Sequence, residues 1–412
     1  MTSLIEPWIA DEARIEVERN SKRAPLHLFL LKVAEFCNLN CTYCFMFNLN
    51  DFSYQKKPKK MSFDVVRATV DNAARIARAQ GTKAIQFSLH GGEPTIMGQA
   101  WLEEAISIIR EYAADDLDIQ IYMQTNAVVI DDSWIDFARR TKIRIGVSMD
   151  GIREVHDKYR VDHKGRGSFD RVVKGLQTLI PHSDVFTGTL TVIDPTVAGL
   201  DVYRGLRDIG VLRMDFLWPL DYNWNNLPDR FEDPAHTPYA DYLIPIFDAW
   251  WQEDNPKVSI RHFENMVAGV MAYKSHLDAI GGQPIGIVSI DTDGGIEPVD
   301  SLRACGDGFT ELGLNILTDP VELVYTKDLF QMAIRGRDNL CEACQMCPVT
   351  DICGAGYLPH RYRSGEGFSR PSVYCKDLWK LTSHIASTVA DTYRDVPLPA
   401  HRSRSDVIDL AS

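Results

Sequence analysis

The chain has 412 residues, of which 45% are hydrophobic and 25% are charged, and this composition is that of an ordinary globular protein. Its formal net charge of −13 argues against nucleic acid as a partner, because phosphate contacts need a basic surface. Residues 1–20 are acidic where a signal peptide would be basic and then apolar, and no run reaches the roughly 18 apolar residues of a membrane span, so we expect a cytoplasmic protein without a membrane partner.

The first half of the chain alternates between strand-like and helix-like segments. Residues 27–34 are a continuous apolar run that predicts a strand buried on both faces, and Ser62 and Gly81 suit the two ends of the helix that follows. Further strands are predicted at 84–90, 119–126, 143–150, 185–193 and 211–220, and further helices at 100–113, 132–140, 168–180 and 199–209. These six alternations predict an α/β fold, a partial (β/α)6 TIM-like barrel of parallel strands.

Polar motifs follow each of the first four predicted strands. They are the cysteine-rich loop 37–44, the sequence GGEPT at 91–95, QTN at 124–126 and SMDG at 148–151. Because the carboxyl ends of parallel strands meet at one mouth of such a fold, we expect these loops to converge on one site.

The pattern changes after residue 220. A polar loop and then helices are predicted up to about 282, and residues 285–300 predict a hairpin with TDGG as its turn. Six of the nine cysteines lie in the last part of the chain. The predicted organisation is an N-terminal extension (1–26), the partial barrel (27–220), a bridging helical insertion (221–282), a C-terminal cysteine-bearing domain (283–395) and a tail (396–412).

The loop CNLNCTYC places Cys37, Cys41 and Cys44 in a C-x3-C-x2-C arrangement. In a reducing compartment such thiols are more often metal ligands than disulfides. One alternative is a structural zinc site, which needs a fourth ligand. The other is a four-iron cluster on three thiolates, which leaves one iron open to a small molecule. No nearby His or Cys completes a zinc tetrahedron, which favours the cluster.

This loop, together with GGEPT, resembles the signatures of the radical S-adenosylmethionine (SAM) enzymes. The resemblance covers residues 27–220 and, through the second cysteine set, 285–385. It implies a SAM-binding [4Fe–4S] cluster, S-adenosyl-L-methionine, and a 5′-deoxyadenosyl radical that abstracts hydrogen from substrate. It also implies a reductant partner such as flavodoxin or ferredoxin.

The resemblance assigns roles residue by residue. Cys37, Cys41 and Cys44 are the implied cluster ligands, and the implied contacts of the SAM amino group are Gly91, Gly92 and Glu93. The positions that match family contacts to the SAM ribose or carboxylate are Thr125, Asn126, Ser148, Asp150 and Arg160. For these last residues, turn formation and surface ion pairing are the alternatives. Phe45 is either an aromatic lid over the cluster or an ordinary core residue.

A second cysteine set resembles the SPASM class of C-terminal iron–sulfur domain. The implied ligands of a complete auxiliary [4Fe–4S] cluster are Cys344, Cys347, Cys353 and Cys375, and four thiolates suit electron transfer. Two positions depart from the two-cluster pattern, since Tyr357 and Val299 stand where that pattern has cysteines. Cys341 is a candidate substitute ligand of this cluster, and Cys305 is a candidate partner of Cys341 in an incomplete site. The alternative for both is a buried thiol.

Asp300 follows the hairpin at a point where the resemblance implies a catalytic base. The alternative is a surface carboxylate at the end of a hairpin. His90 and His360 could also act as bases, although a lone histidine beside a strand end is usually a hydrogen-bonded structural residue.

The second cysteine set and its surroundings resemble most the maturases that form cyclophane-type C–C crosslinks in ribosomally made precursor peptides. The expected partner is then a precursor peptide with a leader. The basic stretch 55–60 is a candidate docking point for an acidic leader, and the favoured alternative for this stretch is a solvated loop. Other SPASM-type chemistry remains as an alternative, namely formylglycine formation, thioether formation or epimerisation. The third hypothesis is a non-enzymatic iron–sulfur electron-transfer protein. The missing first auxiliary cluster weighs modestly against formylglycine formation.

Overall fold

The computed structural model describes residues 11–112, 116–275 and 277–393. The predicted tail (396–412) and the first ten residues of the predicted N-terminal extension lie outside these ranges. The chain divides into two compact units. The first comprises Met1–Ser148, His156–Thr187 and Ile285–Ile334, and the second comprises Met149–Val155, Gly188–Pro284 and Arg335–Ser412. Across the described ranges, no helix has the length and apolar character that crossing a membrane requires.

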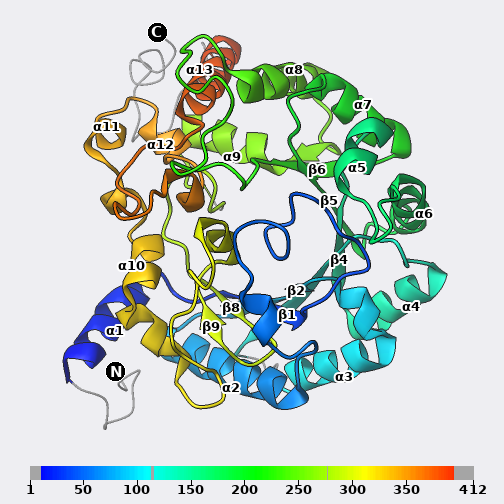
Figure 1. Ribbon diagram of the computed structural model, residues 1–412, viewed down its shortest axis with the longest axis vertical. Coiled ribbons are helices and arrows are strands. Elements are labelled where there is room, and N and C mark those ends of the chain that lie inside the picture. Colours follow the sequence, from blue (N-terminus) through cyan, green and yellow to red (C-terminus); the bar gives the residue numbers. More distant parts are fainter. Residues whose placement is uncertain (1–10, 113–115, 276, 394–412) are drawn as a thin grey trace. The chain divides into compact units, whose positions relative to one another are not determined.

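The first unit is built on parallel strands that alternate with helices. Its strands pair in parallel, with Phe29 opposite Phe87 and Phe87 opposite Ile121. The strands are β1 (Leu28–Ala34), β2 (Ala84–Gly91), β3 (Asp118–Thr125) and β4 (Arg144–Ser148), and the connecting helices are α2 (Phe63–Gln80), α3 (Gln99–Arg110) and α4 (Asp132–Thr141). Figure 1 shows these three helices along the same side of the strands. The strands and helices predicted for this stretch are confirmed.

Local sequence explains the ends of α2. The Ser62 hydroxyl accepts a hydrogen bond from the Val65 N–H at 3.3 Å, and Gly81 ends the helix in the left-handed conformation, with φ of 69°. The buried face includes Val66, Val70 and other small apolar residues at helical spacing.

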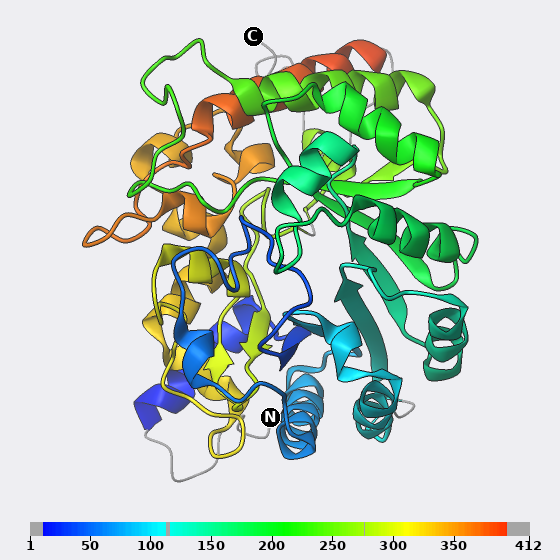
Figure 2. The same ribbon diagram turned by 45° about the vertical axis from the view of Figure 1, so that its right-hand side comes forward.

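The predicted hairpin is also confirmed, with an unexpected pairing. Its strands, β8 (Ile287–Ile290) and β9 (Ile296–Glu297), are antiparallel, but β8 also pairs in parallel with β1, with Ile287 opposite Leu28. The 3-10 helix η3 (Asp300–Cys305) follows directly. Figure 2 shows this yellow segment beside the first strand. Asp300 therefore belongs to the same unit as the three-cysteine loop.

The remaining elements of the first unit are helical. The sequence did not indicate α1 (Asp11–Arg23), which packs against η4 (Val321–Thr326) and α10 (Asp328–Ile334). The predicted helix after β4 is confirmed as α6 (Phe169–Leu179). It is preceded by the short α5 (Arg153–Tyr159), which was not predicted.

The second unit combines parallel strands with a group of helices. It contains most of β5 (Phe186–Val192), with β6 (Arg213–Leu217) and the unpredicted β7 (Ser259–Ile260), in parallel pairs. Its helices are α7 (Gly199–Ile209), α8 (Pro238–Glu253), α9 (Arg261–Val270) and α13 (Cys375–Thr392). In Figure 2, α8 and α13 lie side by side. Three short helices carry or border the C-terminal cysteines, and these are α11 (Glu342–Gln345), α12 (Thr350–Cys353) and η6 (Leu358–Arg361).

Candidate functional site

The three-cysteine loop (residues 36–50) follows β1 in the first unit. Burial, and next the nearby Glu93, raises the pKa of the Cys37 thiol to about 12; burial, and next Cys41, raises the pKa of Cys44 to about 11. The Leu39 N–H donates to the Cys37 sulfur at 3.4 Å, and backbone N–H groups also donate to Cys44. Amide donors aimed at sulfur suit thiolates that ligate an iron–sulfur cluster.

The two glycines of GGEPT lie against this loop. The Gly92 N–H donates to the Ala34 carbonyl at 2.7 Å, and the Glu93 N–H donates to the Phe36 carbonyl at 3.1 Å. A Cβ atom on Gly92 would lie 1.9 Å from the Phe36 oxygen, so no other residue fits there without moving the loop. The resemblance placed both glycines at the SAM amino group. The structure also gives them a second task, which is to let two loops pack backbone to backbone.

The Glu93 carboxylate joins the second loop to the third. It is 1% exposed and accepts four hydrogen bonds. Two come from the N–H and hydroxyl of Thr95, one from the Thr125 hydroxyl at 2.6 Å and one from the Asn126 N–H at 2.7 Å. Burial raises the pKa of Glu93, while these donors lower it. The Asn126 amide in turn donates to Asn38 at 2.7 Å and to the Cys37 sulfur at 3.7 Å. The predicted convergence of these three loops is therefore confirmed.

Arg160 also lies near the cysteines. It is 8% exposed, its guanidinium stands 5.5 Å from the centre of the Tyr43 ring, and its charge favours the thiolate form of Cys44. The backbone of this segment holds the loop in place, because the Thr42 N–H donates to the Tyr159 carbonyl at 3.0 Å. A buried cation beside the cysteines is consistent with the predicted role in binding a carboxylate.

The two residues predicted after β4 fall in different units. Ser148, in the first unit, is half-buried and accepts a hydrogen bond from the Gln124 amide at 2.9 Å. Asp150, in the second unit, is fully buried, and its Oδ1 accepts from the Val192 N–H at 3.1 Å. Phe45 is half-buried within the three-cysteine loop.

Asp300 is paired with His90 rather than exposed on the surface. It is 7% exposed, and its Oδ2 lies 3.6 Å from His90 Nδ1. Within the described residues neither of these two buried atoms has a hydrogen-bond partner. Burial lowers the pKa of His90, and Asp300 raises it. The hairpin-end alternative for Asp300 is thus wrong as a description of its environment.

A buried ionic network in the first unit was not predicted from the sequence. Its cations are Lys32, Lys57 and Arg303, and its anions are Asp51, Asp291 and Glu297. Lys32 Nζ lies 2.7 Å from Glu297, and Arg303 Nη2 lies 2.8 Å from Asp291; all of these side chains are 8% exposed or less. Burial disfavours the charged form of Glu297, but Lys32 and Arg303 lower its pKa. One signal was visible, since Lys32 interrupts an otherwise apolar strand.

This network connects β1 and the end of the three-cysteine loop to the segment that carries Asp300. Asn50 donates to the Ala304 carbonyl at 3.1 Å, and the Gly308 N–H donates to Asp51 at 3.1 Å. Lys57, part of the basic stretch predicted as a docking point, is 8% exposed at its side chain and belongs to the network. Asp300 is therefore held against the first strand and the loop that carries Cys37.

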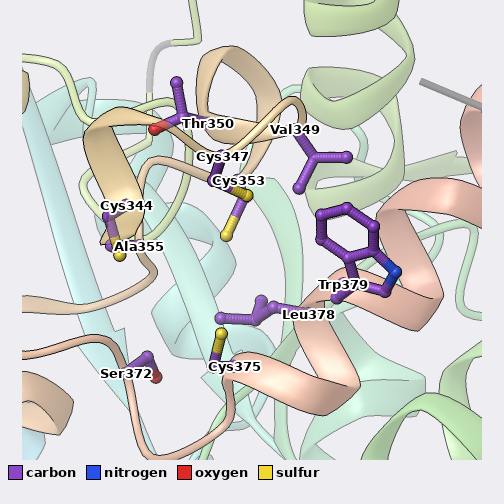
Figure 3. Close-up of a pocket in the computed structure, with 10 residues that line it drawn as sticks. All are labelled: Cys344, Cys347, Val349, Thr350, Cys353, Ala355, Ser372, Cys375, Leu378 and Trp379. Atoms are coloured by element: carbon purple, nitrogen blue, oxygen red, sulfur yellow. The ribbon is translucent and has the colours of Figure 1, made fainter. Parts of the chain in front are cut away.

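Four cysteines of the second unit line one cavity of about 340 Å³, a figure that includes space open to solvent. Figure 3 shows Cys353 and Cys375 with their sulfurs facing each other across this space. The other cysteines of the lining are Cys344 and Cys347, and the remaining neighbours include Val349, Ala355, Leu378 and Trp379. Burial raises the pKa of Cys353 to about 12, and the Ala355 and Gly356 N–H groups donate to it. This set of thiols in an apolar cavity fits a cluster held by four thiolates. In the described ranges, no three His, Cys, Asp or Glu side chains form a group suited to a single metal ion.

The two cysteines outside the predicted ligand sets, Cys341 and Cys305, differ in their surroundings. Cys341 packs against Cys344 at the edge of this cavity, with Leu340 and Ala355. Cys305 is 8% exposed in the first unit, and burial raises its pKa. At the two positions that depart from the two-cluster pattern, Val299 is 5% exposed and Tyr357 packs edge-on against the His360 ring.

His360 has the role of a hydrogen-bonded structural residue, which was the alternative to its acting as a base. It is 1% exposed, and its Nε2 lies 3.0 Å from the Pro219 carbonyl. Burial lowers its pKa to about 3. Trp218 packs on the Tyr374 ring at 5.1 Å, and Tyr374 donates to the same Pro219 carbonyl at 2.9 Å. These side chains form an aromatic cluster next to Cys375.

Comparisons with known proteins agree with this arrangement. Residues 31–198 match the radical SAM superfamily. The chain is 25% identical over 381 residues to the cysteine-type anaerobic sulfatase-maturating enzyme of Clostridium novyi, covering 89% of this chain and 98% of that protein. It is 24% identical over 381 residues to the serine-type enzyme of Bacteroides thetaiotaomicron, covering 88% and 90%.

Solved structures share the fold. The structure described as native anSMEcpe with bound AdoMet and Cp18Cys peptide has a TM-score of 0.76 and 22% identity, covering 90% of this chain and 99% of that chain. This similarity supports the predicted partial barrel, and the α/β class is confirmed. Residues 31–198 are thus a radical SAM domain, and the chain is a radical SAM enzyme.

Proposed function

We propose that this enzyme oxidises a cysteine or serine side chain of a peptide or protein segment to formylglycine. The observation that carries the proposal is the match along nearly the whole chain to enzymes named for sulfatase maturation, of both the cysteine and the serine type. One solved structure of this fold holds a bound peptide, Cp18Cys, together with AdoMet. The crosslinking chemistry expected from the sequence has no such support and becomes the second candidate.

The assignments at the first site follow from this proposal. Cys37, Cys41 and Cys44 would hold the [4Fe–4S] cluster, which would supply the electron for SAM cleavage. The three loops joined by Glu93 shape the SAM site. Its proposed contacts within the first unit are the backbone of Gly91 and Gly92 and the side chains of Thr125, Asn126, Ser148 and Arg160. The hydrogen bonds described above support this assignment, because they hold the loops around the cysteines.

Asp300 is the proposed proton acceptor. Its Oδ2 is buried and lacks a hydrogen-bond partner among the described residues, so the atom is available to a substrate proton. His90 Nδ1 lies 3.6 Å from this oxygen, beyond hydrogen-bond distance, and leaves it open to the substrate. A cysteine CH2–SH group loses one hydrogen atom to the adenosyl radical, one proton to Asp300 and one electron to an acceptor, which leaves a thioaldehyde. Water then replaces the sulfur to give the aldehyde and hydrogen sulfide.

The acceptor of that electron is the proposed auxiliary cluster on Cys344, Cys347, Cys353 and Cys375. A reductant such as flavodoxin or ferredoxin supplies the electron that the first site needs for SAM cleavage. The second candidate, a C–C crosslink, uses the same base and the same acceptor. The observation that favours it is the pair Val299 and Tyr357, which leaves one complete four-cysteine cavity rather than the two-cluster pattern.

The test uses the reconstituted enzyme, SAM, a strong reductant and a peptide with one cysteine, with a twin that carries serine in place of the cysteine. Formylglycine predicts that sulfur is exchanged for oxygen with loss of two hydrogens in the first peptide. It predicts loss of two hydrogens alone in the second, and both products are captured by a hydrazide. A loss of two hydrogens without hydrazide capture supports crosslinking. SAM cleavage that leaves both peptides unchanged contradicts the proposal.

A second test concerns Asp300. In Asp300→Asn, SAM cleavage without peptide is retained, and the rate of aldehyde formation falls by about 10²–10⁴-fold, the usual contribution of a general base. Asp184→Asn is the control, because Asp184 is an exposed carboxylate of the same unit, 58% exposed and paired with Arg139. Equal aldehyde formation in Asp300→Asn and the wild type would exclude Asp300 as the base.

A further inference from the structure

Arg361 is a buried cation with few partners. It ends η6, is 4% exposed, and donates from Nη2 to the Asn339 carbonyl at 3.4 Å. Its Nε is buried and has no hydrogen-bond partner among the residues that the structure describes. A guanidinium carries five N–H donors, so most of its donor capacity is unused.

The segment that Arg361 contacts leads directly to cysteines of the cavity region. Burial lowers the pKa of Arg361, whereas Cys344 and then Cys341 raise it. Asn339, which accepts its hydrogen bond, precedes Cys341 by two residues, and Cys341 packs against Cys344 at the cavity. Within the described part of the chain, no carboxylate forms an ion pair with Arg361. The second unit thus places an unpaired guanidinium on the segment that leads to Cys341, and Cys341 packs against Cys344 of the four-cysteine cavity.

Such a cation is costly unless an anion accompanies it. Burying one ion without a partner carries a large desolvation penalty, and removing one partner of a buried pair leaves a comparable cost. The cysteines do not supply the anion while they are neutral thiols. They become thiolates when they ligate iron, and a cluster on four thiolates makes the cavity anionic.

We propose that Arg361 is the charge partner of the auxiliary cluster and holds its reduction potential at a more positive value. This inference rests on the proposed function, in which the cluster accepts an electron from the substrate. Reduction adds one negative charge to the cavity, and a fixed positive charge beside the Cys344 thiolate stabilises the reduced state more than the oxidised state. Arg361 thereby favours electron transfer to this site without touching the substrate.

The test measures a potential rather than activity. Full-length protein carrying Cys37→Ala, Cys41→Ala and Cys44→Ala retains only the C-terminal cysteine cluster, which is reconstituted and titrated with dithionite under electron paramagnetic resonance. In this background, Arg361→Met shifts the midpoint potential to more negative values, and Arg361→Lys, which keeps the charge, shifts it less. Arg363→Met is the matched control, because Arg363 lies two residues away, is 45% exposed and pairs with Glu366; its potential stays at the parent value.

The outcomes separate this inference from the proposed function. Protein that binds no iron in this background contradicts the auxiliary cluster itself. An intact cluster whose potential is the same with Arg361 or Met contradicts the inference alone, as does a shift of equal size in Arg361→Met and Arg361→Lys. If the methionine variant loses its cluster, the lysine variant decides: retention of a cluster supports charge pairing, and loss shows that shape rather than charge is required.

Discussion

The two cysteine sites of this enzyme are stabilised in different ways. The three-cysteine loop of the first unit is surrounded by polar loops, by the Glu93 carboxylate with its four accepted hydrogen bonds, and by a buried ionic network. The four-cysteine cavity of the second unit is lined by apolar side chains, with an aromatic cluster beside Cys375 and a single buried guanidinium nearby. The contrast follows from what each site is proposed to bind. Three thiolates leave room for a polar small molecule, whereas four thiolates enclose a cluster.

The two units also differ in the buried groups that could accept a proton. In the first unit, Asp300 and His90 offer buried polar atoms without hydrogen-bond partners among the described residues, which suits chemistry on a substrate. In the second unit, His360 is held neutral and bonded to backbone. The first unit thus has a polar, partly unsatisfied site and the second an apolar one, which matches the proposed division of the reaction.

The largest expected effect separates the two cysteine sites directly. Cys41→Ala abolishes SAM cleavage, because the open-site cluster loses one of its three thiolates. Cys353→Ala leaves some SAM cleavage but gives no mature product, because only the auxiliary site is damaged. Both are measured as 5′-deoxyadenosine and product from the same anaerobic reaction. An equal loss of SAM cleavage in both variants would mean that the C-terminal cysteines only hold the fold together.

A second effect tests whether the ionic network stabilises the first unit. Lys32→Met removes one cation from a fully buried group of charges, and such a change costs about 3–5 kcal/mol because an uncompensated charge remains. The measurement is the free energy of unfolding by denaturant. The control is Arg140→Met in the same unit, where Arg140 and Glu103 form an exposed pair, 53% and 46% exposed, whose loss costs about 0–1 kcal/mol. Similar losses in the two variants would contradict the role given to the network.

The smallest effect concerns acid stability of the second unit. The folded state holds the pKa of His360 at about 3, below its ordinary value of 6.5, so unfolding takes up a proton in acid. The stabilisation is complete above about pH 6.5 and is lost as the pH falls towards about 3. His360→Gln, which can still donate to the Pro219 carbonyl, lowers this dependence of Tm on pH. His27→Gln, at an exposed histidine, leaves it as in the wild type. If both variants keep the wild-type dependence, His360 is not the group responsible.

Much of the first site was predictable from local sequence. The strand at 27–34, the cap at Ser62 and the motifs after each strand depend on periodicity and turn chemistry, which act over a few residues. The ligand spacing of Cys37, Cys41 and Cys44 and the grouping of the four C-terminal cysteines also followed from the sequence. The substrate chemistry did not, because cyclophane crosslinking and formylglycine formation use the same motifs. The comparisons shifted the proposal to the second.

Other features depend on contacts between residues far apart in the chain. The parallel pairing of β8 with β1 joins residues more than 250 positions apart, and it brings Asp300 to the first site. The ionic partners of Lys32 and the unpaired state of Arg361 among the described residues are likewise invisible to periodicity, because burial and charge pairing are properties of the folded neighbourhood. The sequence alone indicated which residues are candidates for the chemistry. Only the tertiary structure decided which charges stand beside them, since electrostatic energy depends on distance and on exclusion of water.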